Sequence, residues 1–232
     1  MKVTRILATS FLAAGLGFVA TPNAHADGAL TLSWNSCSWV QNLDFTGPGQ
    51  VANLLVSVTG ETRPVKGGRI QISIGTNLGD AWRFDAAGCN VGQVSLNTAG
   101  LNKACPAFQG TNPLPIFNYS YDEVTGKALL DALNAYDERT PTGVVETMYQ
   151  FLFNHVFSDV GPQDPALACG DADGSVCFHI VYTEHLNPDL TQGTYNVANE
   201  WVTWQDPLNE TQCPGPTQNE NSTWGRVKGL YR

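Results

Sequence analysis

The chain has 232 residues and is acidic, because 12 Lys and Arg stand against 21 Asp and Glu for a formal net charge of −9 at pH 7. An acidic surface repels phosphate backbones, so a nucleic acid is excluded as an expected partner. The length is enough for one sizeable domain or at most two small ones.

Residues 1–26 predict an export signal. A short positive start holds Lys2 and Arg5, an apolar run follows, and Ala-His-Ala at 24–26 has the small-x-small pattern of a signal-peptidase site. The run is shorter than the roughly 20 residues that a membrane-spanning helix needs. We therefore expect a mature chain from about Asp27, with ten cations against twenty-one anions and no transmembrane segment. It would be secreted, extracellular or on the cell surface, with the periplasm as a further possibility.

Short segments that alternate apolar and polar residues predict β-strands. In the segment 69–75, the side chains of Ile70, Ile72 and Ile74 face one way. The segment 147–157 is expected to be covered on both sides, because apolar residues lie on both of its faces. Its aromatic face holds Tyr149, Phe151, Phe153, His155 and Phe157, and its other face holds Leu152 and Val156. The expected strands are 29–34, 53–60, 69–75, 147–157, 175–185 and 200–206. This spacing is typical of an all-β, antiparallel β-sandwich, which we place at 27–207.

The pattern of the segment 125–139 is compatible with either a helix or a strand. Leu129, Leu133 and Tyr136 recur at helical spacing among residues of good helix propensity. The surrounding segments are strand-like, and a β-rich context often overrides a short local preference. We favour a strand with an irregular end, with a helix as the alternative.

All the cysteines lie after the signal. An even number in an exported chain predicts three disulfides, whose pairing the sequence alone does not fix. The spacing is not that of a zinc site. Proximity along the chain favours Cys89–Cys105 and Cys169–Cys177, which leaves Cys37 with Cys213. The six are Cys37, Cys89, Cys105, Cys169, Cys177 and Cys213.

The loop 169–177, "CGDADGSVC", is a candidate calcium site. Asp171 and Asp173 alternate before Gly174, and carboxylates with carbonyl oxygens are the ligands that calcium prefers. The further acidic positions of an EF-hand loop are missing. An ordinary surface turn rich in Asp and Gly explains the same residues.

Two tryptophans near the end of the domain suggest a glycan site. Trp201 and Trp204 have opposite parity, so one is expected to pack inwards while the other is exposed for stacking on a sugar ring. His179 and His185 share parity on the expected strand 175–185, but about 20 Å would separate them, too far for one metal. No nucleophile elbow, zinc-protease motif or phosphate loop is present, so no catalytic residue is assigned and an enzyme is the less favoured class.

After the domain, residues 208–223 read as an exposed linker rich in Pro, Asn, Thr and Gln. Residues 224–232 form a basic, aromatic tail. It is a candidate docking peptide for a surface protein or the secretion machinery, although it can equally fold back onto the acidic body or be a frayed end. Its candidate contact residues are Trp224, Arg226, Lys228, Tyr231 and Arg232.

The ending "STWGRVKGLYR" resembles that of a group of uncharacterised exported bacterial proteins, and "DAWRFDAAGCN", "KACPAF", "VCFHI" and "VTWQDP" resemble parts of the same group. This resemblance implies a β-sandwich and export, and no catalytic activity. A looser likeness, carried by "LLVSVTG" and "VKGGRIQISIG", is to cohesin-like and immunoglobulin-like surface modules. Such alternation is a fold-level likeness only.

The sequence therefore predicts a secreted or cell-surface structural or recognition module, stabilised by disulfides. Its tail would serve sorting or docking. A carbohydrate-binding module is the alternative, and an extracellular hydrolase without a recognised motif comes after it. No cofactor is expected beyond possible calcium at Asp171 and Asp173.

Overall fold

A computed structural model describes residues 28–75, 78–97, 106–108, 113–142, 144–155, 169–170, 172 and 174–205. The predicted signal, linker and tail fall outside these residues, as do Val156 and Phe157. No helix in the described ranges is both long and apolar enough to span a bilayer.

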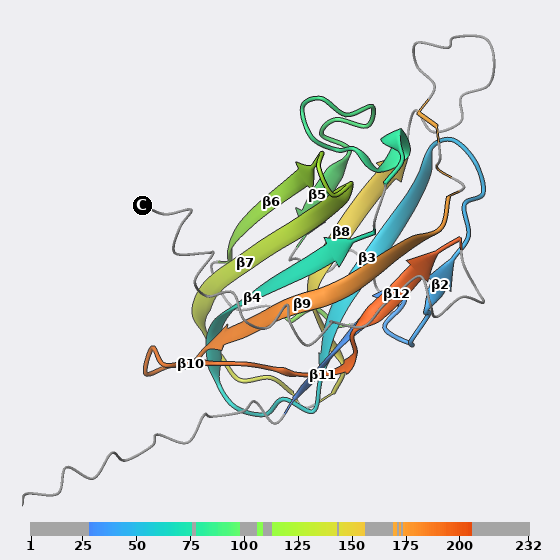
Figure 1. The fold of residues 1–232 in the computed structure, drawn as a ribbon. Coiled ribbons are helices and arrows are strands. Elements are labelled where there is room, and N and C mark those ends of the chain that lie inside the picture. Colours follow the sequence, from blue (N-terminus) through green and yellow to red (C-terminus); the bar gives the residue numbers. More distant parts are fainter. Residues whose placement is uncertain are drawn as a thin grey trace, which may run out of the picture.

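Two β-sheets lie face to face (Figure 1). The five-stranded sheet has the order β11-β1-β3-β8-β5, and the seven-stranded sheet has the order β2-β12-β9-β4-β7-β6, with β10 paired to β9. Most pairings are antiparallel, whereas β1–β11 and β2–β12 are parallel. The predicted fold class, an all-β sandwich with a disulfide, is confirmed.

The smaller sheet consists of β1 (Ala29–Trp34), β3 (Gln50–Thr59), β5 (Val94–Asn97), β8 (Glu146–His155) and β11 (Asn196–Asn199). The larger sheet consists of β2 (Asn42–Leu43), β4 (Val65–Ile74), β6 (Leu114–Asp122), β7 (Lys127–Arg139), β9 (Val176–Leu186), β10 (Gln192–Gly193) and β12 (Trp201–Trp204). One short 3-10 helix, η1 (Asp80–Trp82), follows β4.

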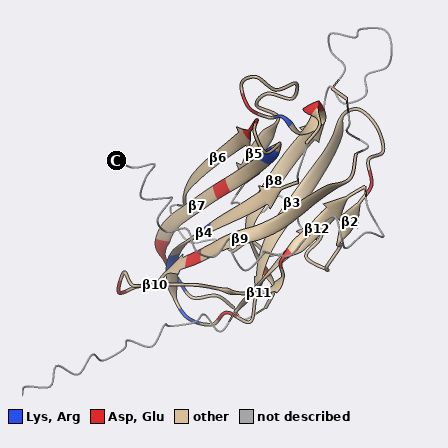
Figure 2. Ribbon diagram, in the orientation of Figure 1, with Lys and Arg blue, Asp and Glu red and all other residues tan. Residues whose placement is uncertain are grey.

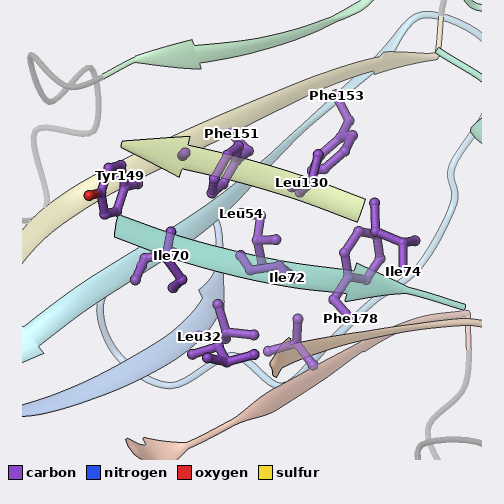
Figure 3. Close-up of a cluster of buried hydrophobic side chains, with 14 of the residues drawn as sticks. Leu32, Leu54, Ile70, Ile72, Ile74, Leu130, Tyr149, Phe151, Phe153 and Phe178 are labelled. Atoms are coloured by element: carbon purple, nitrogen blue, oxygen red, sulfur yellow. The ribbon is translucent and has the colours of Figure 1, made fainter. Parts of the chain in front are cut away.

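The strand pattern of the sequence produces the core directly. Ile70, Ile72 and Ile74 alternate along β4 and all point inwards. Figure 3 shows them among buried side chains such as Leu54 of β3 and Phe151 of β8. Burial of such side chains is the main favourable contribution to folding, at about 25 cal/mol per Å² of apolar surface.

The ambiguous segment 125–139 is a strand, β7, as we favoured. It pairs with β4 and β6, and its pairing with β4 shifts register between Val65 and Gly67, which gives the irregular end. Leu130 and Tyr136 are buried, whereas Leu133 faces solvent. The local preference of this segment for a helix is therefore overridden by its pairing with a neighbouring strand on each edge.

A β-bulge in β9 overturns the predicted parity of the histidines. The pairing of β9 with β4 shifts between Gln71 and Ile72, so Val181 is left unpaired and the later residues of β9 change face. His179 pairs with Ser73 on the outer face, whereas His185 pairs with Gly68 on the inner face. The two imidazoles are thus on opposite sides of the sheet.

The disulfide pairing by sequence proximity was wrong. Cys89 is bonded to Cys169, at a sequence separation of 80 residues. The reason is that the sandwich brings loops from distant parts of the chain to one end, where the amide of Ala81 donates a hydrogen bond to the carbonyl of Gly170. Cys37 and Cys177 are also disulfide-bonded, and the described residues include no free cysteine. Cys105 and Cys213 lie outside the described residues.

Candidate functional site on the outer face of the larger sheet

Three exposed apolar side chains gather at one corner of the larger sheet. Strand register places Ile116 of β6 opposite Leu133 of β7, and Leu114 opposite Ala135. The exposed fractions are 69% for Leu114, 65% for Ile116 and 37% for Leu133. We call Leu114, Ile116 and Leu133 the outer patch. Exposed apolar side chains at neighbouring positions, unlike scattered ones, are typical of an interaction surface.

A polar cluster fixed by ion pairing borders the outer patch. Arg69 of β4 donates two hydrogen bonds to the Asp131 carboxylate of β7, at 2.9 and 2.6 Å, and Gln71 donates a third at 3.0 Å. Partial burial by itself would raise the pKa of Asp131, but these hydrogen bonds outweigh it and lower the pKa overall. The bidentate geometry holds both side chains in place, so this part of the face is rigid.

The cluster continues onto β9. The Arg69 guanidinium lies 5.7 Å from the centre of the Tyr182 ring, and the Tyr182 hydroxyl donates to the Glu184 carboxylate. Burial, together with this acidic neighbour, raises the pKa of Tyr182 to about 12. Figure 2 shows acidic positions on β7 and β9 along this face. The face therefore combines an apolar corner with an ordered, charged centre.

Strand β6 is a long edge strand of this sheet in the described part of the chain, and β5 of the smaller sheet lies near it without pairing. Within the described residues β6 pairs only with β7 and is nine residues long. The other three edge strands of the two sheets, β2, β5 and β11, have two, four and four residues. Proteins generally keep edge strands short or covered, because unpaired backbone groups are a template for another strand.

The inner side of β6 is aromatic and only half-buried. Phe117, Tyr119 and Tyr121 alternate along it with exposed residues. The Tyr119 hydroxyl donates to the carbonyl of Trp82 at 2.5 Å, and burial raises the pKa of this phenol. The guanidinium of Arg83 lies 4.2 Å from the centre of the Tyr121 ring. These contacts fix the strand while leaving ring surface open at its edge.

The two tryptophans predicted to bind a glycan differ in burial. Trp204 is fully buried, and its indole N–H donates to the carbonyl of Ala172 at 2.7 Å, so it has no face to offer a sugar. Trp201 is half-buried on the outer face, opposite His179 in the register. His179 lies 3.6 Å from the carboxylate of Glu200. Of the two tryptophans, only Trp201 stays a candidate.

The remaining predicted site residues are not placed. Asp171 and Asp173 of the calcium loop lie outside the described residues, and so do Trp224, Arg226, Lys228, Tyr231 and Arg232 of the tail. Among the described residues, no group of three or more His, Cys, Asp or Glu is arranged to hold a metal ion.

Sequence reasoning missed β6 and hence the outer patch. The signal was present, because "IFNYSYD" at 116–122 alternates aromatic with polar residues. The three members of the patch come from two strands, so no single stretch of sequence reveals that they are neighbours.

No protein-family model matches the chain, and no curated protein matches it. Among solved structures it is similar to cohesin modules. One, from a Clostridium perfringens family 33 glycoside hydrolase, has 11% identity and a TM-score of 0.39, covering 78% of this chain and 99% of that one. A type II cohesin domain from the cellulosome of Acetivibrio cellulolyticus has 7% identity and a TM-score of 0.38, covering 77% and 95%. The third ScaB cohesin of R. flavefaciens, in complex with a group 1 dockerin, has 11% identity and a TM-score of 0.35, covering 80% and 100%.

These neighbours are of the kind that the looser sequence likeness named. At such low identities and TM-scores they carry no argument about function, and the fold assignment depends on the strands themselves. The resemblance to exported proteins with the same ending stays a prediction.

Proposed function

We propose that this chain is a secreted or cell-surface recognition module that binds a protein partner through the outer face of its larger sheet. The observation that carries the proposal is the outer patch, in which three exposed apolar side chains occupy neighbouring positions on a sheet held rigid by the Arg69–Asp131 pair. A protein–protein interface combines apolar contacts with polar groups at their rim, and here Arg69 and Asp131 border the outer patch on one side. The export signal predicted at residues 1–26 supports the location.

The test uses a photo-crosslinking residue at position 116 in the mature chain, without residues 224–232, in the exported fraction of cells that produce it. An adduct with one protein is expected, followed by reconstitution of that pair from purified components. Ile116→Glu should then weaken binding at least tenfold, because it places a charge in the apolar centre.

Val51→Glu is the matched control, since Val51, like Ile116, is an exposed β-branched strand residue but lies on β3 of the other sheet. It should leave the affinity unchanged. Equal loss in both variants, or adducts at position 116 that match those at position 51, would rule the outer patch out as an interface.

The tail is the second part of this proposal. Its cations and aromatics, Trp224, Arg226, Lys228, Tyr231 and Arg232, suit docking or sorting at an acidic partner surface. Deletion of residues 224–232 should change where the exported protein accumulates. Unchanged secretion and unchanged surface retention would contradict a sorting role.

A glycan-binding function is supported only by Trp201. Its half-buried ring lies on the outer face beside His179, with Glu200 close by as a partner for sugar hydroxyls. Titration of a glycan panel against wild type and Trp201→Ala, followed by tryptophan fluorescence, would test it. A calcium role for Asp171 and Asp173 is tested by calorimetry, where absence of heat and of a melting shift would remove it.

A further inference from the structure

The edge of β6 that faces away from β7 is unpaired in the described part of the chain, and residues 224–232 have the length and the alternation of a strand that fits it. We infer that residues 224–232 pair with β6 of the same chain as an added antiparallel strand. β6 is nine residues long, and the segment from Trp224 to Arg232 also has nine. Backbone hydrogen bonds to an exposed edge supply affinity in such strand addition, while alternate side chains set the specificity. The inference goes beyond partner binding at the outer patch, and it is an alternative to docking of the tail on an external partner.

The side chains of the tail alternate as a strand at this edge requires. Even-numbered positions carry the bulky and charged groups, Trp224, Arg226, Lys228, Leu230 and Arg232. Odd-numbered positions are small or apolar, namely Gly225, Val227, Gly229 and Tyr231. In β6, even-numbered residues also face outwards and odd-numbered ones face inwards. A strand with one mainly charged face and one apolar face therefore meets an edge whose outer side is exposed and whose inner side is aromatic.

The direction of the chain favours antiparallel pairing. The pairings β12–β9, β9–β4, β4–β7 and β7–β6 are all antiparallel, so β12 and β6 run the same way. Their carboxyl ends, at Trp204 and Asp122, lie at the same end of the sheet. A chain that leaves β12 there reaches β6 at Asp122 and runs back along it towards Leu114.

The intervening chain is long enough for this path. Four strand spacings separate β12 from β6 and a fifth leads to the added strand, for about 24 Å at the usual spacing of neighbouring strands. Eighteen residues, 206–223, lie before the tail. A chain of that length spans at most about 60 Å when fully extended. The tail therefore reaches its own edge without strain, at a high effective concentration.

One register matches both faces. With Trp224 opposite Asp122 and Arg232 opposite Leu114, Leu230 lies opposite Ile116 and extends the outer patch. On the inner side, Gly225 and Gly229 come opposite Tyr121 and Phe117. A glycine weakens a strand, but an aromatic ring across from it covers the exposed backbone and offsets part of that cost.

Charge favours the same register. Arg226 and Lys228 lie opposite Ser120 and Asn118, with Asp122 diagonal to Arg226. Glu123, whose side chain is 75% exposed, follows β6 directly. The tail therefore brings cations towards Asp122 and Glu123, which also have Lys127 and Arg83 near them.

The experiment is hydrogen exchange, read by mass spectrometry, on the purified mature chain and on the same chain without residues 224–232. Amides of 114–122 that point away from β7 should exchange at least tenfold faster after the deletion, whereas those of β3 should not change. A peptide of residues 222–232 added in trans should restore the protection. If the amides of 114–122 exchange equally in both chains, some other segment covers the edge and the inference is wrong.

Two matched variants keep the test specific. Exchanging two neighbours, V227K with K228V, keeps the composition of the tail but puts a cation on its inner face, so protection of β6 should be lost. Ser120→Lys in the body should repel Arg226 and expose the edge, whereas Ser120→Thr should not. If either disruptive variant keeps full protection, the proposed register is overturned.

Light scattering at the same concentrations distinguishes the chain's own tail from that of a second copy. A monomer with a protected β6 is expected. Protection that appears only in a dimer would overturn pairing within one chain. Partner binding at the outer patch is measured in the truncated chain, so failure of either proposal leaves the other intact.

Discussion

The two ends of the sandwich core differ in chemistry. At one end, between η1, β8 and β12, the core is aromatic. The rings of Trp82 and Trp204 lie 5.0 Å apart, and His155 lies 4.6 Å from Trp82 and 5.0 Å from Trp204. At the other end, the inward side chains are polar. His185 lies 4.8 Å from Tyr195, and the buried Glu61 belongs to the same end.

Hydrogen bonding is incomplete at both ends: within the described residues, the aromatic end leaves Trp82 Nε1 without a partner and the ring nitrogens of His155 without a well-formed hydrogen bond. The indole N–H groups of Trp34 and Trp204 each donate to a backbone carbonyl at 2.7 Å. At the polar end, Tyr149 donates to the carbonyl of Gly68 at 2.5 Å. Within the described residues, the buried hydroxyls of Tyr136 and Tyr195 have no such partner. Buried polar groups without partners cost free energy at both ends, so we expect the aromatic end to hold more of the stability because of its ring-on-ring packing, and not because of better hydrogen bonding.

The largest effect should come from the centre of the aromatic end. Trp82→Ala removes a fully buried ring that contacts five others, and we expect a loss of about 4 kcal/mol in the free energy of unfolding. Urea unfolding followed by far-ultraviolet circular dichroism measures it. Trp39→Ala is the control, since Trp39 is 65% exposed and should cost less than about 0.5 kcal/mol. Equal losses in the two variants would contradict the comparison.

The disulfide at the same end should be next. The double substitution Cys89→Ala/Cys169→Ala opens a bridge with a sequence separation of 80 residues, and we expect a loss of about 3 kcal/mol. Thermal unfolding of the oxidised protein gives the change. Peptide mapping by mass spectrometry gives the pairing independently, and a Cys89–Cys105 peptide would show that the assignment is wrong.

His155 should make the aromatic end sensitive to acid. Burial lowers its pKa from 6.5 to about 4, although the nearby carbonyl of Ala81 offsets a part of that cost. The unfolded chain therefore binds a proton between pH 6.5 and pH 4 that the folded chain does not, so stability falls as the pH falls through this window. We expect a loss of about 2 kcal/mol between pH 6 and pH 4.5 from this group.

The variant His155→Phe removes that contribution, so its unfolding free energy should depend less on pH over the same range. Burial lowers the pKa of His185 as well, so a part of the dependence should persist. Identical pH profiles for wild type and His155→Phe, measured by urea unfolding at each pH, would exclude His155 as the cause.

The smallest effects should come from the polar end, and they should differ from one tyrosine to the next. Tyr149→Phe removes the hydroxyl that donates to Gly68 and should cost about 1 kcal/mol. Tyr195→Phe removes a buried hydroxyl that has no partner in the described part of the chain, and should be neutral within about 0.5 kcal/mol or stabilising. If Tyr195→Phe costs as much as Tyr149→Phe, the Tyr195 hydroxyl is hydrogen-bonded in the folded protein, and this contrast between the two tyrosines is wrong.

The alternation of apolar and polar residues within single segments was enough to predict most of the long strands. The expected strands at 29–34 and 69–75 are found as β1 and β4, because a period of two requires nothing beyond the strand itself. The strand β6 was missed although its pattern was present. The candidate site could not be predicted, since Ile116 and Leu133 meet only through the register of two strands.

The sequence by itself determined the class of the molecule: an acidic chain with paired cysteines and segments whose period of two demands buried pleated sheet. Only the tertiary structure decided which cysteines pair, which histidine faces inwards and where apolar side chains stay exposed. The physical reason is that these properties depend on register, bulges and the meeting of distant loops. A single unpaired residue, Val181, is enough to turn His185 into the core.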